Sequence, residues 1–276
     1  MHKIYILVRK IWHDFFYKPI KQVTTLRLTP IQYGQTLKGK KILITGGSDG
    51  IGYAIAKKFV SEGADVMITG RNEDRLKLAL SRLKSIHICQ WDISDIDILD
   101  TKLDDCISEL GGLDVLINNA AFFERGKHSD RDFYETTMRT NAESVYLICQ
   151  KVVMIYQKIN MDKGGKIINI SSMNAIQSST SPYAISKATV DAITRGFAIE
   201  YADKNIQVNA IAPGYCNSSI NKLDDKNNYF SDLTRINRII LPEEIAEIAM
   251  FLSTDAANGI IGQTILCDGG ATLQQA

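Results

Sequence analysis

A tyrosine and a lysine four residues apart, Tyr183 and Lys187, could work together as an acid–base pair. Residues at i and i+4 share a helix face, so the ammonium group would lie beside the phenol hydroxyl. A free phenol titrates near 10, which is too high for efficient proton transfer at neutral pH. A fixed cation nearby favours the phenolate, and about 4 kcal/mol would bring the pKa close to 7. The same spacing is common on ordinary amphipathic helices, so the interpretation of this pair as catalytic depends on the other motifs in the chain.

A glycine-rich turn upstream could hold the phosphates of a dinucleotide. The apolar run at 41–46 indicates a short buried strand, and residues 51–60 repeat apolar side chains at helical spacing. The turn between them reads Thr45-Gly-Gly-Ser-Asp-Gly-Ile-Gly52. Glycines let the backbone approach a pyrophosphate, and the following helix offers free N–H groups at its N-terminus. The spacing is G-x-x-x-G-x-G, not G-x-G-x-x-G, and taken alone it also fits a turn that binds nothing.

Strands and helices alternate from residue 40 onward, which predicts a parallel sheet with helices on both faces. We expect strands at 41–46, 64–69, 86–89, 113–117, 165–170, 206–211 and 264–267, and helices at 51–60, 73–83, 96–110, 131–160, 183–203 and 242–253. The fold class is therefore α/β, a Rossmann-type doubly wound parallel sheet of about seven strands. The chain has 276 residues, 45% of them hydrophobic, enough for one large domain over 39–276.

Polar residues gather where these strands end. They are residues 46–52, Asp92, 118–121, 171–172 and 213–218. Ligands of open α/β sheets bind at the carboxyl ends of the strands. The pattern therefore predicts one binding site along this edge of the sheet.

Composition excludes several classes of function. The formal net charge is +1, which gives no indication of nucleic-acid binding. The five cysteines are scattered without a C-x-x-C pair, which favours reduced thiols in a cytoplasmic protein over disulfides or zinc. The four histidines have no metal-ligand spacing, so we expect no metal site.

Residues 1–38 form a basic extension with a net charge of +6, against −5 for the remainder. The segment lacks a secretory cleavage signal, and its apolar runs are too short to span a bilayer. Apolar residues recur there at helical spacing, interleaved with basic ones, at Ile4, Leu7, Val8, Ile11, Trp12 and Phe15. Such a helix could lie on an anionic membrane surface or dock on the domain or a second subunit, and we favour docking because docking stripes are commoner.

Together these motifs resemble the compact, single-domain branch of the short-chain dehydrogenase/reductase family, from about Leu37 to the C-terminus. The resemblance implies hydride transfer between a nicotinamide and a carbonyl or secondary alcohol. Tyr183 would exchange a proton with the reacting oxygen, and Ser172 would hold that oxygen in place. Lys187 would lower the pKa of the tyrosine and bind the nicotinamide ribose. Asn141 would hold a water in a proton relay. Ser172 stands 11 positions before Tyr183, closer than is usual in the family, and Ser171 is a fallback.

The resemblance also implies a set of cofactor-binding residues. Asp92, with Ile93 beside it, would contact adenine, and Pro213 and Gly214 would cover the nicotinamide. Ala121 replaces a usual glycine, and Ser218 stands where threonine often bonds the carboxamide. The whole set is Thr45, Gly46, Ser48, Asp49, Gly50, Ile51, Gly52, Arg71, Asn72, Asp92, Ile93, Asn119, Ala120, Ala121, Tyr183, Lys187, Pro213, Gly214 and Ser218. A homodimer or homotetramer through the helices at 131–160 and 181–203 is implied as well.

The residues after the second strand indicate the cofactor. NAD sites place an acidic residue there for the ribose 2′-hydroxyl, whereas NADP needs a positive group for the 2′-phosphate. Here Gly70 takes the acidic position, and the guanidinium of Arg71 suits a phosphate. Two points argue against NADP. Asp49 stands where NADP-preferring relatives often carry a basic residue, and Arg71 could instead be an exposed arginine that stacks on the adenine ring. We expect NADP(H), with NAD(H) as the alternative.

Two other functions share some of these features. Nucleotide-sugar epimerases and dehydratases also use Tyr-x-x-x-Lys, but they resemble G-x-x-G-x-x-G at the loop and carry a larger C-terminal domain. A cofactor-binding scaffold or sensor tethered by the basic extension would commonly have lost the tyrosine or the lysine. The polar stretch 215–238, expected to form a lid, favours a small polar substrate such as a sugar or polyol.

Overall fold

The computed structural model describes residues 34–124, 130–159, 163–177, 179–216 and 228–273. Nearly all of the basic extension therefore lies outside the described residues. Within them, seven strands form one parallel sheet in the order β3-β2-β1-β4-β5-β6-β7. The strands are β1 Lys41–Ile44, β2 Asp65–Gly70, β3 Ile86–Gln90, β4 Val115–Asn118, β5 Gly165–Ile170, β6 Ile206–Pro213 and β7 Thr264–Cys267. The Rossmann-type doubly wound sheet is confirmed.

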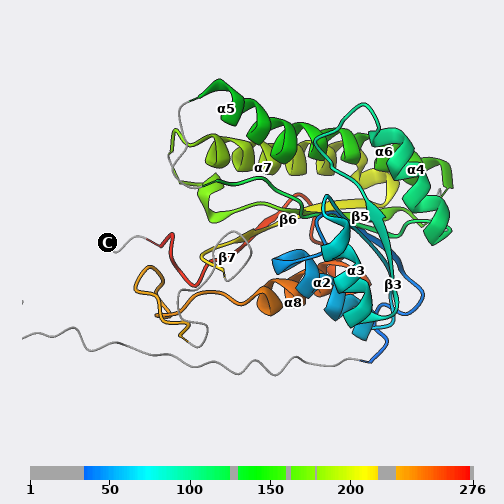
Figure 1. Cartoon of the computed structure of the whole chain (residues 1–276), viewed down its shortest axis with the longest axis horizontal. Coiled ribbons are helices and arrows are strands. Elements are labelled where there is room, and N and C mark those ends of the chain that lie inside the picture. The colour runs from blue at the N-terminus through cyan, green and yellow to red at the C-terminus, as the bar shows by residue number, and fades with distance from the viewer. Residues whose placement is uncertain (1–33, 125–129, 160–162, 178, 217–227, 274–276) are drawn as a thin grey trace, which may run out of the picture.

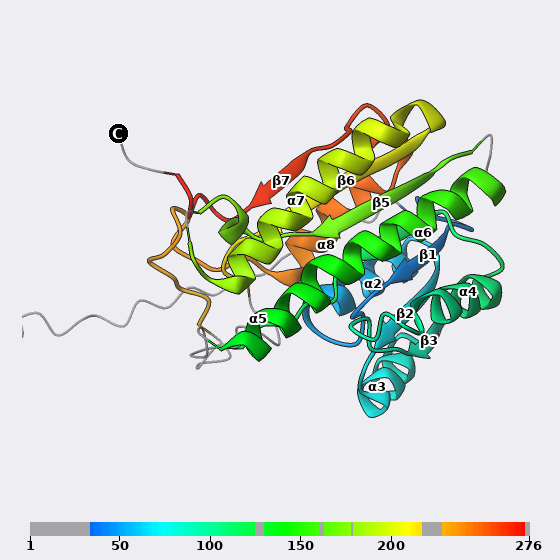
Figure 2. The same ribbon diagram turned by 90° about the horizontal axis from the view of Figure 1, so that it is seen from above.

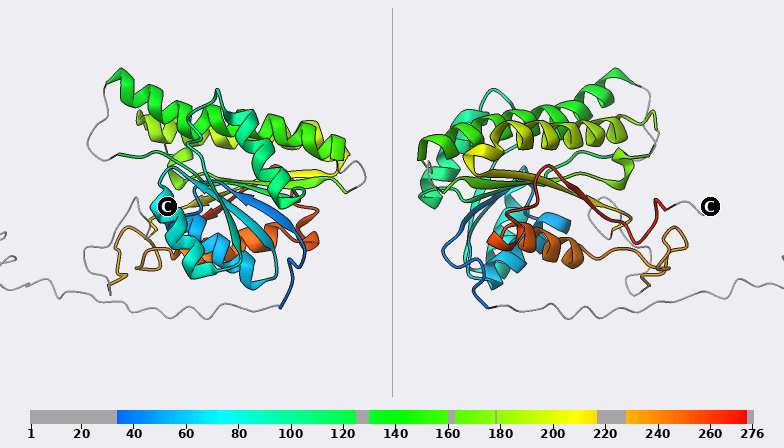
Figure 3. Two further views of the ribbon diagram at one scale, coloured as in Figure 1. Left: turned by 45° about the vertical axis from the view of Figure 1, so that its right-hand side comes forward. Right: turned by 180° about the vertical axis from the view of Figure 1, so that it is seen from behind.

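Helices cover both faces of this sheet (Figure 1). One layer holds α4 Leu99–Leu110, α5 Arg131–Met138, α6 Ser144–Ile159 and α7 Pro182–Tyr201, and the other holds α2 Gly50–Ser61, α3 Glu73–Leu83 and α8 Pro242–Leu252. Figure 3 shows the sheet between the two layers from two further sides. Short 3₁₀ turns follow at Met173–Ala175, Ala202–Lys204 and Asp255–Ala257.

Each layer closes its own apolar core, because successive side chains of a strand point to opposite faces. In β1, Ile42 and Ile44 belong to the cluster under α2 and α8, whereas Leu43 belongs to the cluster under α4 and α6. All three are fully buried. Strands buried on both faces read as continuous apolar runs, which explains why the strand segments stand out in the sequence.

The long helix expected at 131–160 is interrupted. A π-helical turn, Arg139–Glu143, separates α5 from α6. Inside it, Asn141 is fully buried and its side chain accepts a hydrogen bond from Phe122 N at 2.7 Å and donates to Phe122 O at 2.9 Å. These long-range bonds widen the helix locally, so no periodic pattern could have predicted the turn. Figure 2 shows α5, α6 and α7 running across the sheet.

A turn delays the helix expected to begin near residue 96. Asp92 Oδ1 accepts hydrogen bonds from Ser94 N at 3.0 Å and Ser94 Oγ at 2.7 Å, and Asp95 N donates to Asp92 O at 3.0 Å. This Asx-type turn competes with helix formation, so α4 begins only at Leu99. No helix among the described ranges is long and apolar enough to cross a membrane.

Candidate active site

A cavity of about 470 Å³ opens along the carboxyl ends of the strands, at the edge where the sequence predicted a site. It extends from the end of β2, past the glycine turn, to the start of α7 and the end of β6. Residues predicted to form the site contribute much of its lining: Gly46, Ser48, Asp49, Ile51, Arg71, Asn72, Asp92, Ile93, Asn119, Ala120, Ala121, Ser172, Tyr183, Lys187, Pro213 and Gly214. The structure therefore brings these sixteen residues together in one space.

The glycine turn is fitted tightly against the end of β4. Gly46 has φ +66°, and a Cβ there would lie 2.8 Å from Ala120 Cα. A Cβ on Gly52 would lie 2.4 Å from Gly46 O, so no side chain fits. Asn119 Nδ2 donates to Thr45 O at 3.0 Å and to Gly46 O at 2.9 Å. The turn is held in a fixed shape by its neighbours rather than by its own residues.

Three predicted cofactor residues do not line the cavity. Thr45 is buried, and its Oγ1 accepts from Asn119 N at 3.0 Å and from Ala120 N at 3.1 Å. Gly50 and Gly52 lie in the first turn of α2, behind the cavity-lining part of the turn. Thr45, Gly50 and Gly52 therefore help to shape the turn, and contacts between these three residues and a cofactor stay predictions. Ser218 lies outside the described residues.

Tyr183 and Lys187 meet Ser172 in the cavity wall. Tyr183 and Ser172 both line the cavity. Lys187 Nζ donates to Ile170 O at 2.7 Å and lies 5.8 Å from the centre of the Tyr183 ring. The edge of the Phe123 ring faces the other side of Tyr183, with 5.0 Å between ring centres. A phenol, a hydroxyl and an ammonium group therefore converge in one partly apolar space.

Burial dominates the protonation of this pair. It raises the pKa of Tyr183 above its ordinary value, and the Ser172 hydroxyl partly lowers it again. Burial also lowers the pKa of Lys187 from 10.5 to about 8, opposed by the nearby Asp191 carboxylate. In this structure the group that lowers the tyrosine pKa is Ser172, and acidification by Lys187 stays a prediction.

Asn141 is not among the residues that line the cavity. Besides its two bonds with Phe122, its Nδ2 donates to Ser186 Oγ at 3.1 Å, and that hydroxyl donates to Tyr183 O at 2.7 Å. The side chain thus ties the π turn to the first turns of α7, which carry the tyrosine. It positions Tyr183, and a water relay through Asn141 stays a prediction.

Charged and polar groups surround the far end of the cavity, at β2 and β3. Arg71 NH1 lies 3.9 Å from Asp92 Oδ2, and Arg75 NH1 lies 3.7 Å from Asp49 Oδ2. Both guanidinium groups are more than half exposed. Asn72 caps α3 by accepting from Arg75 N at 2.9 Å. Two guanidinium groups therefore flank one opening, and among the described residues each makes only a long ion pair.

Sequence reasoning missed several lining residues. Arg75 carried a usable signal, because Asn72 marks the helix start and places Arg75 in the first turn of α3, close to Arg71 in the chain. The others carried none that we recognise: Thr69, Trp91, Phe123, Thr140, Ile170, Met173 and Asn174. Thr69 Oγ1 and Trp91 Nε1 are buried and make no hydrogen bond within the described structure. The described residues contain no cluster of three potential metal ligands.

Known proteins are similar to this chain over most of its length. Residues 46–272 match the family model described as enoyl-(acyl carrier protein) reductase. A glucose 1-dehydrogenase of Gluconobacter oxydans is 36% identical over 256 residues, covering 88% of this chain and 96% of that protein. The 3-oxoacyl-(acyl-carrier-protein) reductase FabG of Chlamydia trachomatis is 32% identical over 246 residues, covering 85% of this chain and 98% of that protein.

A solved structure shows the same architecture. The short-chain dehydrogenase from Burkholderia cenocepacia in complex with NADP superposes with a TM-score of 0.78 at 28% identity. The match covers 86% of this chain and 99% of the other. The similarity therefore includes the whole of the smaller protein.

The buried ammonium group of Lys187 should make stability depend on pH. Its pKa is about 8 when folded and 10.5 ordinarily, a difference of about 3 kcal/mol. Below pH 8 both states carry the proton and the full cost of burying the charge is present. Between pH 8 and 10.5 the unfolded chain binds more protons, so stability rises with pH.

We therefore expect Lys187→Met to be more stable than the original chain at pH 7, by about 1–3 kcal/mol after loss of the bond to Ile170 O. The advantage should shrink by pH 9.5. Urea unfolding at both pH values measures it, with the exposed Lys77→Met as control. An advantage that does not change with pH would contradict the buried charge.

Proposed function

The chain belongs to the short-chain dehydrogenase/reductase family, and from this premise we propose that it transfers a hydride between NADP(H) and a carbonyl or secondary alcohol. The observation that carries the proposal is the convergence of Tyr183, Ser172 and Lys187 on one cavity with the glycine turn at its other side. The residues fit a dinucleotide, because the glycines let the turn pack closely against the end of β4 and α2 presents its N-terminus at the cavity.

The nicotinamide, when bound, supplies or accepts the hydride. In the reductive direction Tyr183 Oη donates its proton to the oxygen of the carbonyl, and in the oxidative direction it takes the proton of the alcohol. Ser172 Oγ hydrogen-bonds the same oxygen and fixes its position. Lys187, whose ammonium already points to the end of β5, binds ribose hydroxyls and adds positive charge that favours the phenolate.

The substrate side of the cavity supports a small polar molecule. Asn174 and Tyr215 line it together with the catalytic serine, and they offer amide and hydroxyl groups. Phe123 forms an apolar wall against the tyrosine ring. A sugar or polyol carbonyl, with hydroxyls on one side and a hydrocarbon face on the other, suits this lining. The relatives include a glucose dehydrogenase and a 3-oxoacyl-(acyl-carrier-protein) reductase, so they leave both substrate classes open.

The preference for NADP(H) rests on two arginines. Arg71 and Arg75 flank the opening near Asp92, and within the described ranges each makes only a long ion pair there. A 2′-phosphate would satisfy both guanidinium groups with charge-assisted hydrogen bonds. The solved relative in complex with NADP supports this choice.

A second copy of the chain is the proposed partner. The outer face of α7 carries an exposed stripe of apolar and small residues at helical spacing, namely Ile185, Ala188, Ala192, Gly196 and Ile199. Ile199 is 84% exposed, and a Cβ on Gly196 would have nothing within 4 Å. Small residues let two helices approach closely. We propose that α7 packs against α7 or α6 of a second copy.

Tyr183→Phe tests the reaction. The change should lower turnover by about 10²–10⁴-fold, because the group that transfers the proton to or from the reacting oxygen is lost. NADPH affinity, measured by isothermal calorimetry, should stay nearly unchanged. Tyr134→Phe, exposed on α5, is the matched control. Turnover near the original rate in Tyr183→Phe would favour a cofactor-binding scaffold or sensor instead.

Replacing the arginines tests the cofactor. Arg71→Ala and Arg75→Ala should each raise the KM for NADPH about tenfold, which corresponds to about 1.4 kcal/mol. The KM for NADH should stay nearly constant, since NADH has no 2′-phosphate. Arg82→Ala, in the last turn of the same helix, is the control. An equal loss with both cofactors would refute recognition of the 2′-phosphate.

Ala192→Glu tests the assembly. The change places a charge in the middle of the stripe, so sedimentation equilibrium should detect a monomer where the original chain forms a dimer or tetramer. Ser81→Glu, exposed on α3 in the opposite layer, should leave the assembly intact. An original chain that is monomeric at micromolar concentration would exclude this interface.

A further inference from the structure

Two cysteines that the proposed mechanism does not use face each other between β3 and α4. Cys89 lies on β3 and Cys106 on α4, and both side chains pack into the apolar core under α4 and α6. Cys89 is partly exposed, and Cys106 is 1% exposed. Both are free thiols. An outer thiol that reagents can reach therefore shares this core with an inner thiol that they cannot reach.

A histidine bridge fixes how β3 and α4 sit against each other. His87 Nδ1 is 2.9 Å from Glu109 Oε1, and its Nε2 is 3.1 Å from Asp65 Oδ1. His87 and Cys89, two residues apart, point to the same face of β3, and Cys106 and Glu109, three apart, share a side of α4. Because α4 returns the chain to a strand parallel to β3, it runs opposite to β3. The bridge therefore sets Cys89 opposite Cys106.

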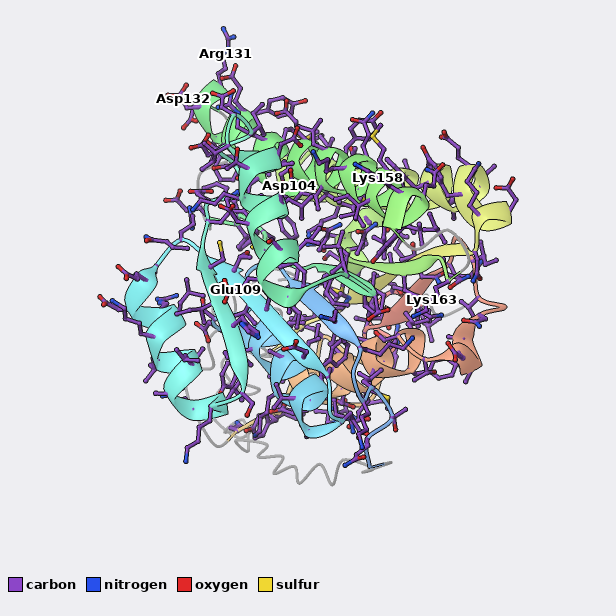
Figure 4. All side chains as sticks on the ribbon, turned by 90° about the vertical axis from the view of Figure 1, so that its right-hand side faces the viewer. Asp104, Glu109, Arg131, Asp132, Lys158 and Lys163 are labelled. Atoms are coloured by element: carbon purple, nitrogen blue, oxygen red, sulfur yellow. The ribbon has the colours of Figure 1, made fainter. Side chains whose placement is uncertain are left out.

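Figure 4 labels Glu109 at the C-terminal end of α4 and Asp104 closer to the N-terminal end of the same helix. Lys102 lies one turn before Cys106 and so on the same side of α4. The neighbouring Cys106 thiol lowers the pKa of Cys89 to about 7, and the Lys102 ammonium adds to this against burial, Asp105 and Glu109. The neighbouring Cys89 thiol and burial raise the pKa of Cys106. The exposed sulfur is thus the one that ionises.

We propose that Cys89 and Cys106 are a redox modification site that closes to a reversible disulfide when the protein meets a hydroperoxide. The Cys89 thiolate attacks the peroxide, the O–O bond breaks, and a sulfenic acid forms while the other oxygen leaves as water or an alcohol after taking a proton. Cys106 sulfur then attacks Cys89 sulfur, and the S–O bond breaks. The departing hydroxide takes the Cys106 proton and leaves as water. Two thiols are oxidised and one peroxide is reduced.

The disulfide would act on the cofactor end of the cavity, and this part rests on the proposed function. A disulfide needs its sulfurs about 2 Å apart. Its closure would draw β3 and α4 toward each other. Gln90 Nε2 donates to Arg71 O at 3.1 Å, and Asp92 Oδ2 lies 3.9 Å from Arg71 NH1. Moving β3 displaces both contacts of Arg71, so NADPH should bind several-fold more weakly and NADH much less so.

The full chain treated with hydrogen peroxide and digested with trypsin tests the disulfide. Cleavage after Lys102 separates the two cysteines, so the peptides 85–102 and 103–125 should be recovered as one cross-linked species. Dithiothreitol should separate them again. Recovery of Cys89 as a sulfinic or sulfonic acid without the cross-link would overturn the proposal, and so would a cross-link between Cys216 and Cys267 in its place.

Variants separate the disulfide from the proposed function. Cys89→Ser and Cys106→Ser should each abolish the cross-link, whereas Cys267→Ser should keep it. Calorimetry with NADPH and NADH before and after oxidation measures the effect on binding. Unchanged NADPH affinity in the cross-linked protein would overturn the coupling to the cofactor site. A chain that binds neither dinucleotide when reduced would defeat the proposed function and leave the disulfide standing.

Discussion

The site depends on a small set of hydrogen bonds that join the ends of β1 and β4. These neighbouring strands are where the strand order changes direction, so their loops diverge and open the cavity between them. The Thr45 hydroxyl accepts from two backbone N–H groups of the β4 end, and the Asn119 amide returns two bonds to the glycine turn. Without these hydrogen bonds, the backbone N–H groups at the end of β4 and the carbonyl groups of the turn would have to bind water instead. The shape of the glycine turn is thus set by β4 as much as by the turn itself.

The same site carries a stability cost that the rest of the fold offsets. A buried ammonium group and a buried phenol, both with pKa values shifted by burial, lie in the cavity wall. The position of Tyr183 is maintained by hydrogen bonds that do not involve its hydroxyl group. Asn141 holds Ser186, which holds the backbone of Tyr183, and the π turn is the local distortion that lets Asn141 reach both Phe122 and α7. Distortions of this kind recur at functional sites.

The sequence predicted the sheet and most of the cavity because their signals are local. The final strand at 264–267 and the helix at 73–83 agree with β7 and α3 to the residue, since apolar runs and caps define both. The π turn and the late start of α4 were missed because contacts distant in sequence, or a competing turn at Asp92, decide them. Phe123 was missed for a related reason: a lone aromatic residue after β4 has no period, and only the fold brings it to Tyr183.

One lining residue gives the protein a built-in optical probe. Trp91 is buried at the cavity wall, and the chain has only one other tryptophan, Trp12 in the basic extension. With Trp12 replaced by phenylalanine, all indole emission would come from a side chain in the cavity wall, next to the end of β3. Reduced nicotinamide absorbs where indole emits, so energy transfer from Trp91 would report occupancy of the cavity in real time. The position of a single core aromatic thus makes binding kinetics readable without any label.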